Sequence, residues 1–303
     1  MRAWRFTAAS AVAALILCGC GGAAKQPLPA GNRIAGSHLT IYVSAPQTGD
    51  SRAAGEAVLD GVTLALDQAH ARVGHYRIRL RALDDADQVT GVWSPAAATR
   101  AAGIAAANPA TIGYIGDFAS GASAVSIPIL NKLAIAEVSP TSTAVGLTSD
   151  GPGSTPGDEA FDYYPTALRT FVRVVPSDYA QAIAQIRLQR SLGCRGVYVL
   201  DDNEYDGIET ANAFYQAAQS EHYPVVSTQS YVPGAASYLS IGQTVAEDSA
   251  DCVLVAAVPG LSAAQLTTQV ARQVPRAKIF ATASLAQPSF TDQADGGIPG
   301  WLD

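Results

Sequence analysis

The sequence has 303 residues, of which 48% are hydrophobic and 15% are charged, and its formal net charge is −7 at pH 7. This composition is typical of a folded globular protein and not of a disordered chain. The negative charge argues against nucleic acid and anionic membrane surfaces as binding partners.

The amino terminus has the pattern of a secretion signal. Two arginines in MRAWR precede an uncharged run, residues 6–17, that is too short to stay in a bilayer as a spanning helix. We therefore predict a signal peptide over residues 1–19, which makes the mature protein extracytoplasmic. Residues 20–37 are rich in Gly, Ala and Pro and are predicted to form a tether.

The cleavage region resembles a bacterial lipobox, in which the cysteine after the cut is acylated. Gly19-Cys20 fits that pattern, with Leu17 three residues before Cys20, whereas Leu17-Cys18 does not. The sequence thus predicts lipidation of Cys20 and a protein anchored to the cell membrane by its lipid. Ordinary secretory cleavage, which leaves Cys20 unmodified, is the alternative.

Apolar runs of strand length alternate with segments of helical period along the rest of the chain. Val58, Val62, Ala65, Leu66 and Ala69 recur on one helical face, and a later Ser-Pro pair at 94–95 is the start signal of a second helix. This alternation predicts parallel sheets with helices on both faces. The expected strands cover residues 39–45, 76–83, 112–116, 135–139, 171–175, 196–201, 224–230, 252–257 and 278–282.

The strands fall into two series, separated by the loop at residues 148–167. Each series predicts one doubly wound α/β lobe, the first over residues 38–175 and the second over residues 176–285. The hinge is expected near Pro176-Ser177-Asp178.

Two cysteines follow the lipobox region, and each lies at or just before the start of a predicted strand of the second lobe. If Cys194 and Cys252 mark the first and third strands of a doubly wound sheet, those strands are neighbours and a disulfide is feasible in an oxidising compartment. Two free thiols are the alternative. Neither cysteine has a histidine at metal-ligand spacing, and we predict no metal site.

Small polar residues mark the turn after the strand at residues 112–116. Ser120-Gly121 begins a helix there, and the unpaired amides of a helix start favour an anion. Ser120 adds a hydroxyl, and Gly121 has no Cβ to keep a ligand from the backbone. We expect this turn to bind a carboxylate; a plain helix N-cap is the alternative.

A second turn rich in hydroxyls, Ser139-Pro140-Thr141-Ser142-Thr143, follows the next strand. Successive strand ends lie close together at one edge of a parallel sheet. The two turns are therefore expected to hold the two oxygens of one carboxylate between them.

Four segments in this order resemble the substrate-binding proteins of branched-chain amino acid ABC transporters, the leucine/isoleucine/valine type. The resemblance covers residues 38–290 and implies a type I periplasmic-binding fold, whose two lobes close on a small ligand and which works with an ABC permease. The segments are IYVSAPQTGDSRAAGEAVLDGVTLALDQA, YIGDFASGASAVSIPILNKLAIAEVSPTSTA, FVRVVPSDYAQA and VYVLDDNEYDGIETANAF.

The resemblance also implies roles for individual residues. Ser120 and Thr143 match the residues that grip the ligand's α-carboxylate, and backbone groups of Ala119 and Thr141 assist them. Tyr205 matches an aromatic residue of the second lobe that closes over the ligand.

The sequence departs from the family where the ligand's ammonium group should bind. The family's carboxylate is expected just after residues 278–282, but this chain reads Ala283-Ser284-Leu285, and a second aromatic expected near residues 256–260 is missing. Asp117 is the first candidate to replace the acid, with Asp202 and Asp206 behind it. Otherwise the ligand is a different small carboxylate or an amide-like compound.

Two further expectations concern an acidic cluster and the carboxyl end. Asp84, Asp85 and Asp87 follow a strand, and three carboxylates in one loop are expected to be solvated. Family members continue well past the GGIPGWLD that ends this sequence, so residues 286–303 are interpreted as the start of a return crossover in a C-terminally truncated chain.

Catalysis has little support in the sequence. The four histidines are scattered, and the chain lacks a G-x-S-x-G nucleophile elbow, a G-x-G-x-x-G loop after the first strand and a Walker loop. We predict a protein that is no enzyme and uses no cofactor, an extracytoplasmic solute-binding protein of an ABC importer for a small amino-acid-like or carboxylate ligand. A ligand-sensing domain and, less favoured, a hydrolase are the alternatives.

Overall fold

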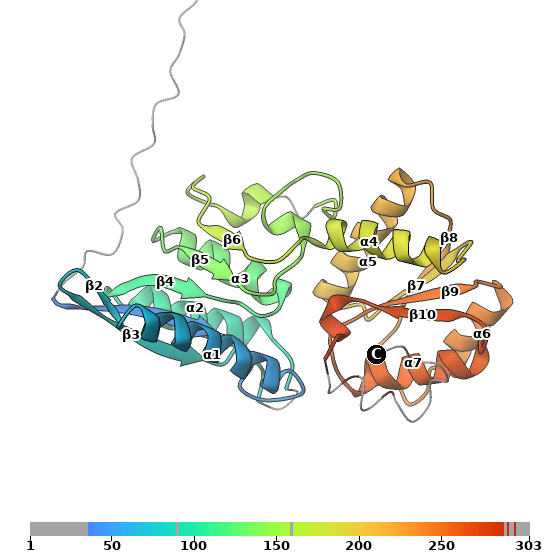
Figure 1. Ribbon diagram of the computed structural model, residues 1–303, viewed down its shortest axis with the longest axis horizontal. Helices are drawn as coiled ribbons and strands as arrows, with labels where there is room; N and C mark the ends of the chain where they lie inside the picture. Colours follow the sequence, from blue (N-terminus) through green and yellow to red (C-terminus); the bar gives the residue numbers. More distant parts are fainter. Residues whose placement is uncertain (1–35, 89–90, 158–159, 288–289, 291–293, 295–303) are drawn as a thin grey trace, which may run out of the picture.

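The computed structural model of the protein describes residues 36–88, 91–157, 160–287, 290 and 294. The predicted signal peptide, Cys20 and nearly all of the tether lie outside these residues. The described strands form two sheets, one of six strands in the order β2-β3-β1-β4-β5-β6 and one of four in the order β10-β9-β7-β8. The two sheets with their helices, called here the first and second lobe, lie side by side (Figure 1). This confirms the predicted α/β fold of two doubly wound lobes.

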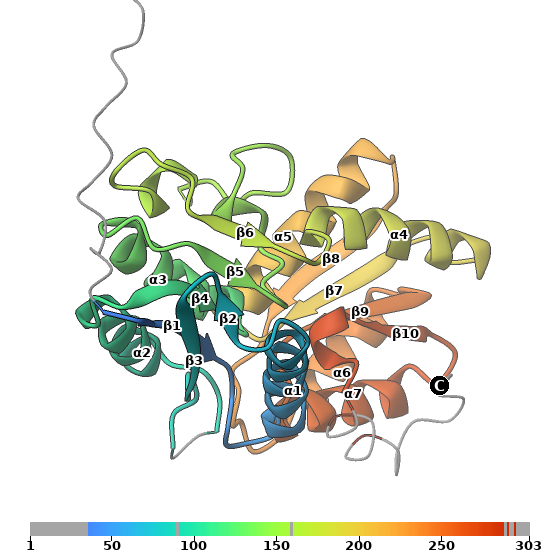
Figure 2. The same ribbon diagram turned by 60° about the vertical axis from the view of Figure 1, so that its left-hand side comes forward.

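The first lobe has helices on both faces of its sheet. Helix α1 lies on one face, and α2 and α3 lie on the other (Figures 1 and 2). Neighbouring strands pair in parallel, apart from the antiparallel β2–β3 pair. The elements are β1 (His38–Ser44), α1 (Arg52–Gln68), β2 (Arg72–Val73), β3 (Tyr76–Leu83), α2 (Pro95–Ala107), β4 (Thr111–Ile115), α3 (Ser120–Asn131), β5 (Glu137–Ser139) and β6 (Phe171–Arg173), with 3-10 turns at Val145–Leu147 and Ala160–Tyr163.

The second lobe repeats this plan with a smaller, wholly parallel sheet. One buried cluster joins the sheet to α4 and α5, and another joins its opposite face to α6 and α7. The elements are α4 (Asp178–Ser191), β7 (Val197–Asp201), α5 (Tyr205–Ser220), β8 (Val225–Ser230), α6 (Leu239–Glu247), β9 (Cys252–Ala256), α7 (Leu261–Gln273), β10 (Lys278–Ala281) and the 3-10 turn Ala283–Leu285.

The start of α2 follows the predicted signal. The Ser94 hydroxyl accepts a hydrogen bond from Ala97 N at 3.2 Å, and Pro95 occupies the first helical position, where its missing N–H costs nothing. Helix α1 agrees less well with its predicted face. Val58, Val62 and Leu66 are half-buried, whereas Ala65 and Ala69 are exposed.

The two cysteines of the second lobe are joined in a disulfide, with their Cα atoms 5.8 Å apart. The pairing of β7 with β9 sets Val197 opposite Cys252, so the first and third strands of this lobe are neighbours, as the sequence predicted. Both cysteines belong to the buried cluster beneath α4 and α5. The disulfide therefore ties the start of β7 to β9 inside the lobe.

Helix α5 of the second lobe is held against the first lobe. The Tyr205 ring packs on a buried first-lobe cluster that includes Ile127 and Tyr163, and the Tyr205 and Tyr163 hydroxyls are 3.0 Å apart. Farther along α5, the Gln216 side chain accepts a hydrogen bond from Gly153 N at 2.9 Å and donates one to Ser154 O at 2.8 Å. The loop that separates the two strand series thus lies between the lobes. Among the described residues, no helix combines the length and hydropathy that a membrane span requires.

Candidate ligand-binding cleft

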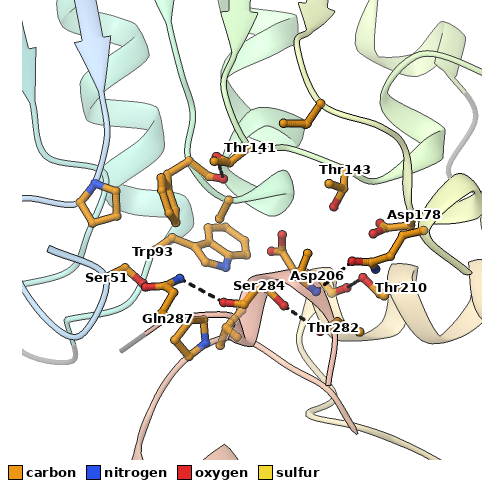
Figure 3. Close-up of a pocket in the computed structure, with 18 of the residues that line it drawn as sticks. Ser51, Trp93, Thr141, Thr143, Asp178, Asp206, Thr210, Thr282, Ser284 and Gln287 are labelled. Atoms are coloured by element: carbon orange, nitrogen blue, oxygen red, sulfur yellow. Dashed lines mark hydrogen bonds between the residues drawn. The ribbon is translucent and has the colours of Figure 1, made fainter. Parts of the chain in front are cut away.

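A cavity of about 570 Å³ lies between the two lobes (Figure 3). Its walls come from the carboxyl ends of strands and from the helix starts that follow them, which is where ligands bind in parallel sheets. The volume falls within the range of about 300–1,000 Å³ that is typical of small-molecule sites. First-lobe walls include Trp93, Phe118, Ala119, Thr141 and Thr143, and second-lobe walls include Asp178, Gln181, Asp206, Thr210, Val258, Thr282 and Ser284.

The two hydroxyl-rich turns of the first lobe are brought together as predicted. The Ser120 hydroxyl accepts hydrogen bonds from Thr143 N at 3.0 Å and Ala144 N at 3.2 Å, which ties the start of α3 to the turn after β5. Ala119, Thr141 and Thr143 line the cleft, whereas Ser120 is only 2% exposed and lies behind its surface. Ser120 therefore shapes the turn from within.

The start of α3 holds a carboxylate, and that carboxylate belongs to the protein itself. Ser120 N donates to Asp206 Oδ1 at 2.7 Å, and Gly121 N donates to Asp206 Oδ2 at 3.3 Å. Asp206 comes from the first turn of α5, in the second lobe. Burial raises the pKa of the Asp206 carboxyl, although the two amides and the Ser120 hydroxyl act in the opposite direction.

A second carboxyl of the second lobe faces the other turn. Asp178 begins α4, and its N–H donates to Thr143 O at 2.9 Å. Burial raises the pKa of the Asp178 carboxyl to about 6, with a further rise from Asp206, while hydrogen bonding from Thr143 and Thr210 lowers it. Figure 3 shows Thr143, Asp178 and Thr210 grouped on one side of the cleft.

The acidic cluster after β3 corrects the expectation that its carboxylates are solvated. Asp84 behaves as a loop cap, because it accepts hydrogen bonds from Gln47 N and Ala86 N, both at 3.0 Å. Asp85, the next residue, lines the cleft and is fully buried. Its Oδ2 accepts a hydrogen bond from Phe118 N at 3.1 Å.

The other oxygen of Asp85 is unpaired. Within the described part of the chain, Asp85 Oδ1 is buried and has no hydrogen-bond partner. Burial raises the pKa of the Asp85 carboxyl to about 8, and the charges of Asp117 and Asp84 raise it further. Sequence reasoning missed this residue because its two acidic neighbours made the whole loop appear solvated.

Two of the acids proposed as ammonium partners are not among the residues that line the cleft. Asp117 is fully buried inside the first lobe, where Tyr114 donates its hydroxyl to Asp117 Oδ1 at 2.8 Å. Hydroxyls of Ser139 and Ser142 donate to the Asp117 carbonyl and fix this turn. The Asp202 carboxylate accepts hydrogen bonds from Glu204 N at 3.1 Å and Val258 N at 2.7 Å, so it acts as a cap. Asp206 is the third proposed acid, and it does line the cleft.

Aromatic walls come from residues that sequence reasoning did not single out. Trp93 and Phe118 line the cleft from the first lobe, while Tyr205 packs between the lobes and is not among the lining residues. The Trp93 ring lies against Gly121, where an added Cβ would collide with the ring. Gly121 therefore admits the indole of Trp93, and not a ligand as the sequence had indicated.

Comparison with known proteins identifies the fold. The model of the family described as the receptor family ligand binding region matches residues 57–273. The chain is similar to a leucine-binding protein from Thermotoga maritima, with 20% identity, a TM-score of 0.69 and coverage of 86% of this chain and 68% of that one. It is also similar to a solute-binding protein of an ABC transporter from R. palustris in complex with 4-hydroxybenzoate, with 15% identity, a TM-score of 0.69 and coverage of 86% and 66%.

A third similar structure is that of a putative branched-chain amino acid ABC transporter from Rhodospirillum rubrum, with 19% identity, a TM-score of 0.54 and coverage of 87% of this chain and 70% of that one. No match was found among the curated proteins. At these identities the likeness shows the fold, which is that of type I periplasmic-binding proteins. The chain spans about two thirds of the length of these structures.

The packing of Trp93 on α3 predicts the effect of adding one methyl group. We expect Gly121→Ala to displace the indole and to lower the free energy of unfolding by about 1–3 kcal/mol, the usual cost of overpacking. Tryptophan emission, with Trp93→Phe as the reference for the Trp93 signal, and denaturant unfolding measure the two effects. Gly103→Ala in α2 is the control, because an added Cβ there meets nothing within 4 Å. Wild-type emission and stability in Gly121→Ala would contradict the contact.

The raised pKa values predict that the free energy of unfolding falls between pH 5 and pH 8. The folded state binds protons at Asp85 and Asp178 more tightly than the unfolded chain does, so their stabilising contribution is complete below the ordinary pKa of 3.8. It is lost as pH rises through about 6 for Asp178 and about 8 for Asp85. Urea unfolding at both pH values measures the slope. Asp85→Asn is expected to reduce it and to stabilise the protein at pH 8, and Asp84→Asn is the control. A slope in Asp85→Asn equal to or steeper than that of the wild type would refute this origin.

Proposed function

Because the chain belongs to the family described as the receptor family ligand binding region, we propose that it is the extracytoplasmic solute-binding protein of an ABC importer. The observation that carries this proposal is the cleft of about 570 Å³ whose walls come from both lobes. A ligand that contacts both walls binds the closed arrangement of the lobes better than an open one, so binding favours closure. The closed form would then dock on a membrane permease.

The proposed ligand is a small molecule that both lobes enclose. The walls combine apolar side chains such as Trp93 and Val258 with a few polar groups, among them Thr141, Thr143 and Gln181. This mixture is usual for sites that enclose a small molecule and fix its orientation with a few hydrogen bonds. In this proposal the lobes cover residues 38–175 and 176–285, and the chain crosses between them near Pro176.

The positions taken from the family resemblance divide into two roles. Ala119, Thr141 and Thr143 line the cleft and would contact the ligand. Ser120 supports them from behind, through the hydrogen bonds from Thr143 N and Ala144 N. Tyr205 supports closure by packing α5 against the first lobe.

An extracytoplasmic ligand-sensing domain is the second candidate, favoured by the description of the family as a receptor ligand-binding region. In both candidate functions the protein binds a ligand in the same cleft. They differ in the partner protein that recognises the closed form. Uptake of the ligand by cells with and without the protein separates them, since uptake that is unchanged in its absence favours sensing.

A ligand screen tests the proposed capture. Amino acids, amides, amines and small carboxylates, each at high concentration, are added to the purified protein and thermal unfolding is measured. A true ligand at 100 times its dissociation constant adds roughly 2.7 kcal/mol to stability. It should also change the emission of Trp93, and Trp93→Phe should lose that change. A panel in which no compound stabilises the protein or alters this emission would refute capture in the cleft.

The lipid anchor is a separate proposal, tested by two neighbouring cysteines. We expect Cys20→Ser to move the protein from the membrane fraction to the soluble extracytoplasmic fraction, because the acyl acceptor is gone. Cys18→Ser is the matched control and should leave the protein on the membrane, since Cys18 lies within the predicted signal peptide. Membrane association that persists in Cys20→Ser would refute lipidation at this residue.

A further inference from the structure

The charged side chains that line the cleft all have the same sign. Among the described residues that line it, the ionisable side chains are Asp85, Asp178 and Asp206, and none is Lys, Arg or His. A ligand with a net negative charge would lose its hydration there without gaining a cationic partner, which is costly. The lining thus favours a neutral or positively charged ligand.

The groups expected to bind a ligand carboxylate are already engaged. The amino terminus of α3 holds the Asp206 carboxylate, 2.7 Å from Ser120 N. Thr143, the other expected partner, makes a side-chain hydrogen bond to the Asp178 carboxyl, and this bond lowers the pKa of that carboxyl. A ligand carboxylate would therefore have to displace two carboxylates of the second lobe from the first.

Asp85 differs from the other two acids because its charge is not balanced by a described neighbour. Asp206 is paired with the amides of α3, and Asp178 has the charge of Arg173 nearby as well as two hydroxyls. The charges that act on Asp85 are those of Asp117 and Asp84, and its buried Oδ1 lacks a partner among the described residues. An unpaired buried carboxylate is unfavourable, and a cation placed beside it would remove that cost.

We propose that the ligand is a small organic cation, an amine or amidine without a carboxylate, whose cationic group binds Oδ1 of Asp85. This inference rests on the proposed function and specifies the chemical class of its ligand. An organic cation fits better than a metal ion, because the described residues contain no group of three side chains that could hold a metal. Trp93 and Phe118 supply aromatic walls against which a cation or its apolar body can pack.

Two matched series of compounds test the charge preference. One comprises 3-methylbutylamine, leucine and 4-methylpentanoate, and the other comprises 2-phenylethylamine, phenylalanine and 3-phenylpropanoate. Titration calorimetry at pH 8 is expected to show at least ten-fold tighter binding of the amine than of the other two members in at least one series. Tighter binding of an amino acid or an acid overturns this inference and leaves capture in the cleft intact. Binding of none of the six also overturns it, whereas the broader screen decides capture separately.

Asp85→Asn tests the assigned residue. We expect the variant to bind the amine at least ten-fold more weakly, whereas Asp84→Asn, which removes the same charge one position away, changes the affinity by less than about two-fold. Amine binding to the wild type should release protons at pH 7, measurable from titrations in buffers of different ionisation enthalpy, because Asp85 must ionise. Asp85→Asn should not release them. Wild-type affinity in Asp85→Asn would overturn the assignment.

Asp206→Ala tests the exclusion of carboxylates. The variant vacates the start of α3, and we expect leucine or 4-methylpentanoate to bind it at least ten-fold tighter than the wild type. Asn212→Ala is the control, since it removes another contact between α5 and the first lobe, the 3.0 Å hydrogen bond to Thr155 Oγ1, without removing a carboxylate. Equal affinities for these carboxylates in Asp206→Ala and the wild type would overturn the exclusion.

Discussion

The contact between the Asp206 carboxylate and the start of α3 determines how the cleft is built. Its two hydrogen bonds, at 2.7 Å to Ser120 N and 3.3 Å to Gly121 N, join the lobes and satisfy amides that the helix leaves unpaired. Hydrogen bonds to a charged group are about twice as strong as neutral ones, and the helix dipole adds to them. The anion-binding site at the start of α3 is thus occupied by a side chain of the protein itself. The cleft that remains for a ligand is lined by acidic and apolar side chains.

Burying these acidic side chains is energetically unfavourable, and the fold does not pair all of their oxygens. Asp117 and Glu137 are also buried acids, and each receives a hydrogen bond, from Tyr114 and Ser126 respectively, and leaves its second oxygen unpaired among the described residues, but neither lines the cleft. Asp85 is buried as well, but it lines the cleft, and one of its oxygens is unpaired among the described residues. Proteins depart from the rule that buried polar groups are satisfied mainly where function requires it, so an unsatisfied acid at a cleft indicates a binding role more strongly than one in a core.

Much of the fold follows from the sequence, and the details of the cleft do not. Strand and helix periods, which are local, predicted two parallel sheets, and the topology of a doubly wound sheet then made the strands of Cys194 and Cys252 neighbours. The turn at Ser120 was interpreted as a site for the carboxylate of a ligand, whereas in the structure the start of α3 holds the Asp206 carboxylate, which depends on how α5 packs and is encoded by no local pattern. Asp84 and Asp85 are adjacent and chemically identical, and only the path of the loop separates a solvated cap from a buried acid. The same loop brings Trp93 onto Gly121.

The contacts of α5 restrict how the two lobes can move relative to each other. Tyr205 and Asp206 at the start of the helix, and Asn212 and Gln216 along it, all bond to the first lobe, so this helix is fastened to both halves of the molecule. A rotation of the second lobe about α5 would preserve these bonds, and the parts of the lobe farthest from α5 would then move most. Trp93 rests on Gly121, whose N–H donates to Asp206 at the start of α5, so its indole lies beside the axis of that rotation. The wall that carries Ser284 would move relative to this indole (Figure 3).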